Sequence, residues 1–216
     1  MKLLLTSAGI KNDSIAKAIL ELVELPADKV RAIFVPTAAN VEVGDKEWLI
    51  TDLNNFEKQG YESVDIIDIA AVPRTVWQPR LEAANLICFG GGDVQFLAKV
   101  MRESGFRDVA RELLKERVYM GISAGSMVAG RFLSRELLRV VYPEESQPEP
   151  LEEALDLVDC NFIPHLNSPW FPQARKEVVE ALTDLKHPLY ALDDESALKI
   201  VEGRIEVVTE GEYLKR

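Results

Sequence analysis

The stretch Val118-Tyr119-Met120-Gly121-Ile122-Ser123-Ala124-Gly125-Ser126-Met127 ends an apolar run in the pattern Gly-x-Ser-x-Gly. A segment compatible with a helix, residues 127–138, follows it. This order predicts a buried strand, a sharp turn that exposes a serine hydroxyl, and a helix. We expect Gly121 and Gly125 to flank a turn so tight that a Cβ at either position would collide with a neighbouring strand or helix.

Strand-like and helix-like segments alternate on the N-terminal side of this stretch. The expected strands are 3–7, 31–35, 63–69 and 85–89, and the expected helices are 13–23, 48–59, 79–84, 94–103 and 106–116. In the second helix we expect Trp48, Leu49, Leu53 and Phe56 to point inward. The alternation predicts βαβ units, and therefore a three-layer α/β fold with a mostly parallel sheet covered by helices on both faces.

The carboxyl ends of parallel strands lie at one edge of a sheet, where ligand sites form in this fold class. That rule gathers residues 7–9, 36–40, 90–93 and Ser123 at the same edge. Beyond residue 138 we expect an exposed loop at 143–150, a strand at 155–162 and a helix at 172–185. Strands at 189–192, 197–201 and 205–209 complete the chain. The absence of any linker or repeat predicts one domain over residues 1–216.

Composition narrows the class of function. The chain has 216 residues, a formal net charge of −11 and a pI of about 4.8, which argues against a nucleic-acid binder. With only two histidines and two cysteines, no metal centre or other cofactor is expected, and Cys88 and Cys160 are expected to be buried free thiols. Neither a signal peptide nor a membrane span is predicted, so we expect a cytoplasmic protein.

A serine hydroxyl needs a base to take its proton, and the base needs an acid to orient it. His165 follows Pro164 at a predicted strand end, whereas His187 lies in a Lys-His-Pro loop that reads as surface. We therefore favour His165 as the base. Without Ser123, it would be interpreted as an ordinary hydrogen-bonded loop histidine. The triplet Asp193-Asp194-Glu195 follows another strand and supplies candidate acids, although alone it would indicate a solvated turn.

The glycine run 90–92 could cradle a phosphate, but no Lys-Ser/Thr follows it. A better use is in an oxyanion hole, where the N–H of Ala124 and that of Gly91 or Gly92 would hold a developing negative charge. The chain order serine, histidine, acid argues against an ordinary α/β-hydrolase, in which the acid precedes the histidine.

Four blocks together resemble the peptidase E and cyanophycinase family of serine peptidases. They are Phe89-Gly90-Gly91-Gly92-Asp93-Val94-Gln95-Phe96-Leu97, Gly121-Ile122-Ser123-Ala124-Gly125-Ser126, Ile163-Pro164-His165 and Leu192-Asp193-Asp194-Glu195-Ser196-Ala197-Leu198. The resemblance implies a fold like that of class I glutamine amidotransferases, which is flavodoxin-like, with Ser123 as nucleophile and His165 as base. The family's glutamate falls on Asp194 and its glycine on Glu195, so both carboxylates stay open as the acid, with Asp194 favoured.

The expected activity is that of a serine exopeptidase, dipeptidase-like, acting on small peptides. The resemblance implies α-aspartyl dipeptides as the commonest substrate class, and Arg175 and Arg131 are the candidate cations for the substrate carboxylate. Two departures bear on that specificity: Asp93 stands where peptidase E members often have Asn, and residues 134–150 offer no clear counterpart to an acidic residue of the family. The alternatives are a catalytically inert amidotransferase-like binding or regulatory protein, and a flavodoxin-like nucleotide binder using residues 90–93. The expected partner is a small peptide, with no nucleic acid and no membrane, and a homodimer is left open.

Overall fold

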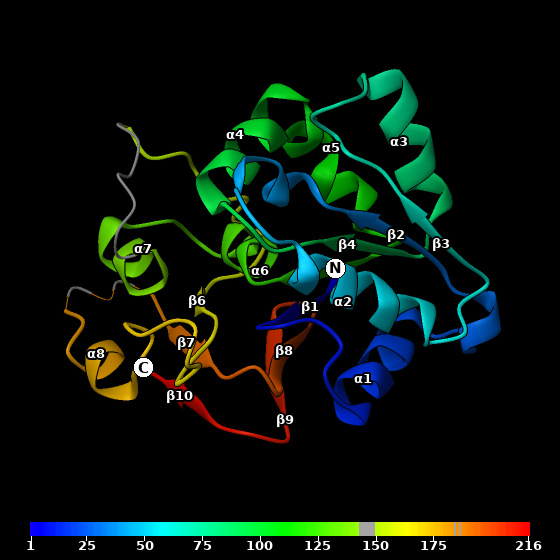
Figure 1. Ribbon diagram of the computed structural model, residues 1–216. Helices are drawn as coiled ribbons and strands as arrows, with labels where there is room; N and C mark the ends of the chain where they lie inside the picture. Colours follow the sequence, from blue (N-terminus) through cyan, green and yellow to red (C-terminus); the bar gives the residue numbers. More distant parts are fainter. Residues whose placement is uncertain (143–149, 184, 186) are drawn as a thin grey trace.

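The computed structural model describes residues 1–142, 150–183, 185 and 187–216. Its centre is a seven-stranded sheet whose first five strands in spatial order are parallel and whose last two are antiparallel to their neighbours (Figure 1). In spatial order the strands are β3 (Ser63–Ile66), β2 (Arg31–Val35), β4 (Leu86–Phe89), β5 (Val118–Ile122), β1 (Lys2–Thr6), β8 (Ser196–Val201) and β9 (Arg204–Thr209).

Helices cover both faces of this sheet (Figure 1). One face packs against α1 (Asp13–Val23) and α2 (Glu47–Glu57), which bury side chains such as Ile15, Ile19 and Phe56. The core of the other face is shared by α3 (Arg74–Ala83), α4 (Val94–Glu103), α5 (Phe106–Leu113), α6 (Ala124–Ala129) and α7 (Arg135–Val141). Every residue of β5 is buried, as its apolar sequence requires of a strand covered on both sides. The predicted three-layer α/β fold is confirmed.

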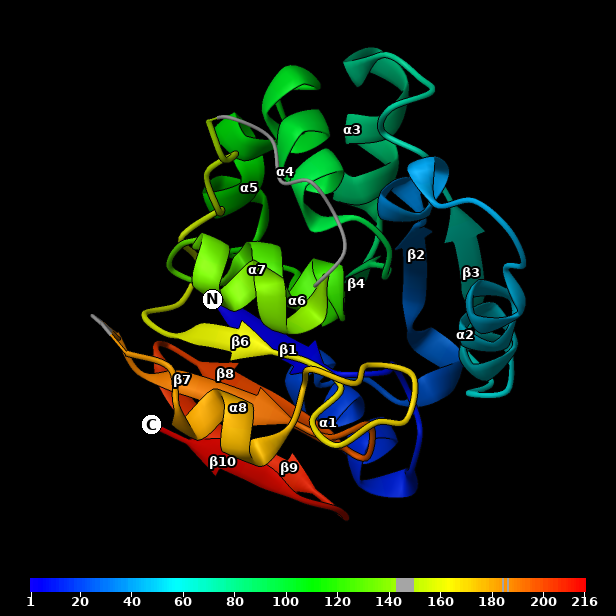
Figure 2. The ribbon, with the colours of Figure 1, turned by 60° about the vertical axis from the view of Figure 1, so that its left-hand side comes forward.

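A second, three-stranded sheet was not predicted. It consists of β10 (Tyr213–Lys215), β7 (Leu189–Leu192) and β6 (Asn161–Ile163), with β6 and β7 parallel and side by side (Figure 2). The short helix α8 (Lys176–Glu180) is held beside it by Arg216, whose guanidinium donates to the carbonyls of Val179, Glu180 and Leu182.

The strand expected at 155–162 is wrong, because only its end forms part of β6. The preceding segment is bonded to the end of α6 instead: the N–H groups of Leu155 and Leu157 donate to the carbonyls of Val128 and Ala129. The last carbonyls of a helix lack partners within the helix, so an adjacent extended segment is a favourable donor for them.

Several helix boundaries also differ. The helix expected at 127–138 is divided into α6 and α7, because the chain leaves the helix at Gly130. The next residue, Arg131, donates its backbone N–H to the carbonyl of Cys160. The helix expected at 79–84 begins earlier, at Arg74, and the one expected at 172–185 is limited to α8. Most of the expected loop 143–150 lies outside the described residues.

Trp48 was expected in the core, but 38% of it is exposed. Phe56, on the same helix, is fully buried as expected. Cys88 and Cys160 are buried free thiols, as predicted. Among the helices of the described ranges, none has the length and apolar character needed to cross a bilayer.

Candidate active site

Ser123 stands on the sharp turn between β5 and α6. Its backbone lies at φ 49° and ψ −107°, a conformation that L-residues rarely adopt. A Cβ on Gly121 would come within 2.6 Å of the Gly125 backbone, and a Cβ on Gly125 would lie 2.1 Å from the Phe89 carbonyl oxygen. The predicted absence of space for a side chain at Gly121 and Gly125 is confirmed. The close packing of these two glycines against the surrounding backbone keeps Ser123 in its strained conformation.

The turn is anchored to the neighbouring strand β1. The Thr6 carbonyl accepts the Ser123 N–H at 3.1 Å and the Ser126 hydroxyl at 2.7 Å. On the other side, the Tyr119 hydroxyl donates to the Gly125 carbonyl at 2.6 Å. These bonds fix both ends of the turn, so the Ser123 side chain is positioned by the sheet rather than by a loose loop.

His165 and Asp194 come from the second sheet. β6 and β7 are parallel neighbours, with Ile163 opposite Ala191, so the residues that follow them emerge together. The imidazole Nε2 of His165 lies 2.9 Å from the Ser123 hydroxyl, and its Nδ1 lies 2.7 Å from a carboxylate oxygen of Asp194. The three side chains form one hydrogen-bonded line across the two sheets.

The order of these bonds sets the state of the imidazole. A carboxylate can only accept, so Nδ1 must donate to Asp194, which leaves Nε2 free to accept the Ser123 proton. Burial would raise the pKa of Asp194, but the hydrogen bond and charge of His165, the bond from Ser7 and the charge of Lys11 together lower that pKa below its ordinary value. The carboxylate is therefore ionised at neutral pH.

Ser7, which directly follows β1, connects His165 to Asp194. Its hydroxyl donates to Asp194 at 2.9 Å and accepts the backbone N–H of His165 at 2.7 Å. His165 has φ 63°, in the left-handed region, so its backbone needs such a restraint. The sequence placed residues 7–9 at this edge, but nothing in a lone Ser-Ala-Gly indicated this contact.

The acidic triplet divides into three different uses. Asp194 bonds to His165, whereas the exposed Glu195 accepts from the Asn12 amide at 3.1 Å. Asp193 accepts the Ser196 hydroxyl at 2.5 Å and orders the turn. Of the two carboxylates left open by the sequence, Asp194 is the one brought to the imidazole.

Phe171 is a further neighbour of His165 that sequence reasoning missed. The two rings are stacked, with centroids 3.9 Å apart and planes 8° from parallel. Phe171 lies in the irregular segment after β6, where no periodicity marks it. Its contact restricts rotation of the imidazole about the axis that the two hydrogen bonds leave open.

The glycine loop 90–92 approaches the serine at one residue. A Cβ on Gly91 would lie 3.5 Å from the Ser123 Cβ and 3.6 Å from the Trp48 ring. Gly92 instead presses on η2 (Thr37–Val41): a Cβ there would lie 2.2 Å from the Ala38 carbonyl oxygen. Ala124 is the first residue of α6, so its N–H has no acceptor within that helix.

The two candidate arginines are placed differently. Arg175 donates to the Ser168 carbonyl at 2.9 Å, and the Ser168 N–H in turn donates to the His165 carbonyl, so Arg175 lies beside the loop that carries His165. Arg131 forms ion pairs with Asp156 at 2.6 Å and Asp159 at 3.9 Å, and no described contact links it to Ser123. His187 bonds to Asp159 and is likewise apart from the serine.

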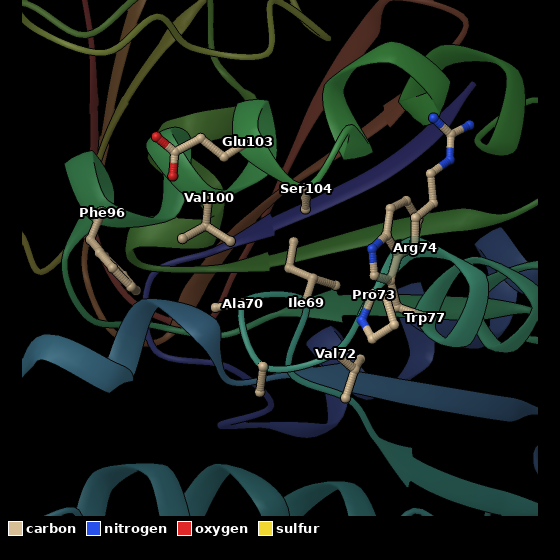
Figure 3. A pocket seen from close by; sticks show the side chains of 11 residues that line it. Ile69, Ala70, Val72, Pro73, Arg74, Trp77, Phe96, Val100, Glu103 and Ser104 are labelled. Carbon is tan, nitrogen blue, oxygen red and sulfur yellow. The ribbon is translucent and has the colours of Figure 1, made fainter.

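A pocket of about 590 Å³ opens between the segment 69–74 and α4, with Trp77 and Phe96 among its walls (Figure 3). Its lining contains none of the three hydrogen-bonded residues Ser123, His165 and Asp194. Ser123, His165 and Asp194 instead lie where the large sheet and the three-stranded sheet approach each other. Ser123 and His165 are each 8% exposed there, which limits solvent access.

The chain is similar to known peptidases over most of its length. The model of peptidase family S51 matches residues 3–208. An uncharacterized peptidase of Listeria monocytogenes is 24% identical over 185 residues, covering 82% of this chain and 83% of that protein. A second uncharacterized peptidase, from Listeria innocua, is 25% identical over 180 residues, with coverage of 79% and 85%.

Solved structures share the fold. The crystal structure of a candidate peptidase E protein from Listeria monocytogenes superimposes with a TM-score of 0.80 at 21% identity, covering 97% of this chain and 98% of that one. A peptidase from an acI-B1 Actinobacterium gives a TM-score of 0.73 at 21% identity, with coverage of 98% and 88%.

Proposed function

The chain belongs to peptidase family S51, and we propose that it is a serine exopeptidase, dipeptidase-like, that hydrolyses small peptides by a Ser-His-acid mechanism. The observation that carries this proposal is the hydrogen-bonded line from Ser123 through His165 to Asp194, at 2.9 and 2.7 Å. A nucleophile, a base and an orienting acid within these distances are the parts that acyl transfer requires.

In the proposed mechanism, the Ser123 hydroxyl attacks the carbonyl carbon of the scissile peptide while His165 Nε2 takes its proton. Asp194 stabilises the imidazolium that forms and keeps Nδ1 protonated. His165 then gives its proton to the leaving amine, and the C–N bond breaks to leave an acyl-enzyme. A water molecule, deprotonated by the same imidazole, hydrolyses the ester and regenerates the serine.

The negative charge on the carbonyl oxygen would be held by the N–H of Ala124 and a second N–H from the glycine loop. Gly91 is the better of the two candidates. Its Cβ position lies 3.5 Å from that of Ser123, whereas Gly92 faces Ala38. Removing one such donor in other enzymes costs on the order of 10²–10³ in rate.

For the substrate we propose a small peptide, with an N-terminal aspartate as the first candidate. Arg175 would bind the aspartate carboxylate, because its position next to the 165–168 loop brings a cation close to the base. The ion pairs of Arg131 with Asp156 and Asp159 make it the weaker candidate. An Arg175→Gln variant should lose its preference for Asp-p-nitroanilide over Ala-p-nitroanilide and retain hydrolysis of the latter.

The proposal is tested with a fluorophosphonate probe and a panel of dipeptides and aminoacyl-p-nitroanilides that includes Asp-Leu and Asp-p-nitroanilide. We expect the wild-type protein to be labelled and to hydrolyse members of the panel, and Ser123→Ala to do neither. Ser63→Ala is the matched control for labelling, since Ser63 is an exposed serine on the edge strand β3. Unchanged hydrolysis by Ser123→Ala would refute the mechanism. Absence of wild-type labelling would instead favour an inert protein with a peptidase fold.

A further inference from the structure

Asp52 is a buried carboxylate that the proposed mechanism does not use. It lies on α2, is 7% exposed, and makes no hydrogen bond or ion pair to any residue of the described ranges. An unpartnered carboxylate in such a place is costly, because burial removes its hydration without replacing it. Binding of a cation or a hydrogen-bond donor from outside the protein would compensate for this cost.

The Asp52 carboxylate lies against Gly9, in the segment that follows β1. A Cβ on Gly9 would lie 2.8 Å from the Asp52 carboxylate and 3.2 Å from the side chain of Ile122, the residue before Ser123. Gly9 has φ +78°, and it follows Ser7, which bonds to Asp194 and His165, by only two residues. The Asp52 carboxylate and the Ile122 side chain therefore both lie against the short segment that follows Ser7.

Trp48 continues the same face of α2 toward the glycine loop. Residues four apart in a helix share a face, so Trp48 lies one turn above Asp52. Its ring lies 3.6 Å from the Cβ position of Gly91, which is itself 3.5 Å from the Ser123 Cβ. One turn of α2 thus connects Gly91, which lies beside Ser123, with Gly9. Its lower end carries the Asp52 carboxyl group, and its upper end carries the partly exposed ring of Trp48.

We propose that Asp52 binds the free α-ammonium group of the substrate, and so restricts cleavage to the first peptide bond of a chain. The inference rests on the proposed peptidase function. An α-amino nitrogen lies about 2.5 Å from the carbonyl carbon of its own residue, so a substrate attacked at its first peptide bond must bring a cation next to the serine. Asp194 already accepts from His165, so Asp52 is the carboxylate that we assign to this cation.

Lys11 supplies positive charge to this region. It is exposed, and its charge lowers the pKa of both Asp52 and Asp194. It makes no ion pair with Asp52 within the described residues, so we assign the substrate ammonium, rather than Lys11, as the partner of that carboxylate. The Trp48 ring would cover the bound amino-terminal residue.

The test compares Asp52→Asn with Glu57→Gln, which removes an exposed carboxylate from the same helix. The substrate is whichever dipeptide or aminoacyl-p-nitroanilide the wild type hydrolyses fastest, and an amine-free fluorophosphonate reports Ser123 reactivity independently. We expect Asp52→Asn to raise KM and lower kcat/KM about 10- to 100-fold, the loss typical of one charged hydrogen bond. The labelling rate should stay unchanged, and Glu57→Gln should behave as wild type in both measurements.

Three outcomes would overturn the assignment: an unchanged KM in Asp52→Asn, an equal fall in labelling and hydrolysis, or a fall of equal size in Glu57→Gln. If the wild type itself is not labelled, the proposed function fails, which is a distinguishable result. A thermal melt of each variant verifies folding, and Asp52→Ala replaces the asparagine variant if the latter does not fold. A second arm uses propionyl-p-nitroanilide, the amine-free counterpart of alanyl-p-nitroanilide, on which Asp52→Asn and wild type should not differ.

Discussion

Phe171 lies flat against the imidazole of His165, with ring centroids 3.9 Å apart and planes 8° from parallel. The two hydrogen bonds of the imidazole fix its ends, and the stacked ring fixes its tilt. Within the described residues, Phe171 has no ring contact or hydrogen bond with Ser123 or Asp194. We therefore assign it a positioning role, in which it acts through the base.

Replacing Phe171 by leucine should lower kcat by a few-fold to about tenfold with little change in KM, because an aromatic stack contributes about 0.5–1.5 kcal/mol beyond its buried area. Steady-state kinetics on the best substrate measures this. The chain offers a matched control in Phe132, which packs edge-on against the other histidine, His187, with centroids 5.6 Å apart. Equal losses in Phe132→Leu and Phe171→Leu would show that the effect is general.

Two adjacent carboxylates provide a second test. Asp194→Asn should lower kcat by about 10³- to 10⁴-fold, because an amide at this position favours the wrong imidazole tautomer. Glu195→Gln should keep activity within about a factor of two, since that side chain bonds to Asn12 on the surface. Rates of hydrolysis and of fluorophosphonate labelling both report the difference. A reversed order would move the acid to Glu195.

The glycines near the serine should respond differently to a methyl group. Gly91→Ala has ordinary contact distance to Ser123 and Trp48, at 3.5 and 3.6 Å, so the fold should tolerate it while the methyl group obstructs the approach of substrate. Gly125→Ala would place its Cβ 2.1 Å from the Phe89 carbonyl oxygen and should destabilise the protein by several kcal/mol. Melting temperature and kcat/KM separate the two effects. A Gly91→Ala protein with full activity would remove Gly91 from the oxyanion hole.

The stability of the fold should depend on Asp52 through pH. Burial raises the pKa of Asp52 from 3.8 to about 7, although the charge of Lys11 lowers it and the buried Cys88 thiol lies within electrostatic reach. Between these two pKa values the folded state holds a proton that the unfolded state has released. Stability from this group is therefore complete below about pH 4 and is lost as pH rises toward 7, by about 4 kcal/mol at most.

Asp52→Asn abolishes that loss. Its melting temperature should exceed that of wild type more at pH 8 than at pH 5, while Glu57→Gln shows no such trend. Thermal melts at the two pH values give the comparison directly. A constant difference between wild type and Asp52→Asn at both pH values would contradict the raised pKa.

The sequence by itself determined the turn at Ser123 and the edge of the large sheet on which it lies. Both follow from local causes. Only glycine fits at positions 121 and 125, and an alternation of apolar strands with helices forces the strands to be parallel. The rule that sites form at strand ends also selected His165 over His187, because a predicted strand ends directly before His165.

Only the tertiary structure decided what meets that serine. His165 and Asp194 are brought together by the register of β6 and β7. Nothing in the sequences of these two short strands predicts that they pair. The choice of Asp194 over Glu195, the stack of Phe171 and the exposure of Trp48 depend on the same long-range packing. Local sterics act within a few residues and can be read along a chain, whereas strand register between distant segments is set by the side chains that the whole fold buries.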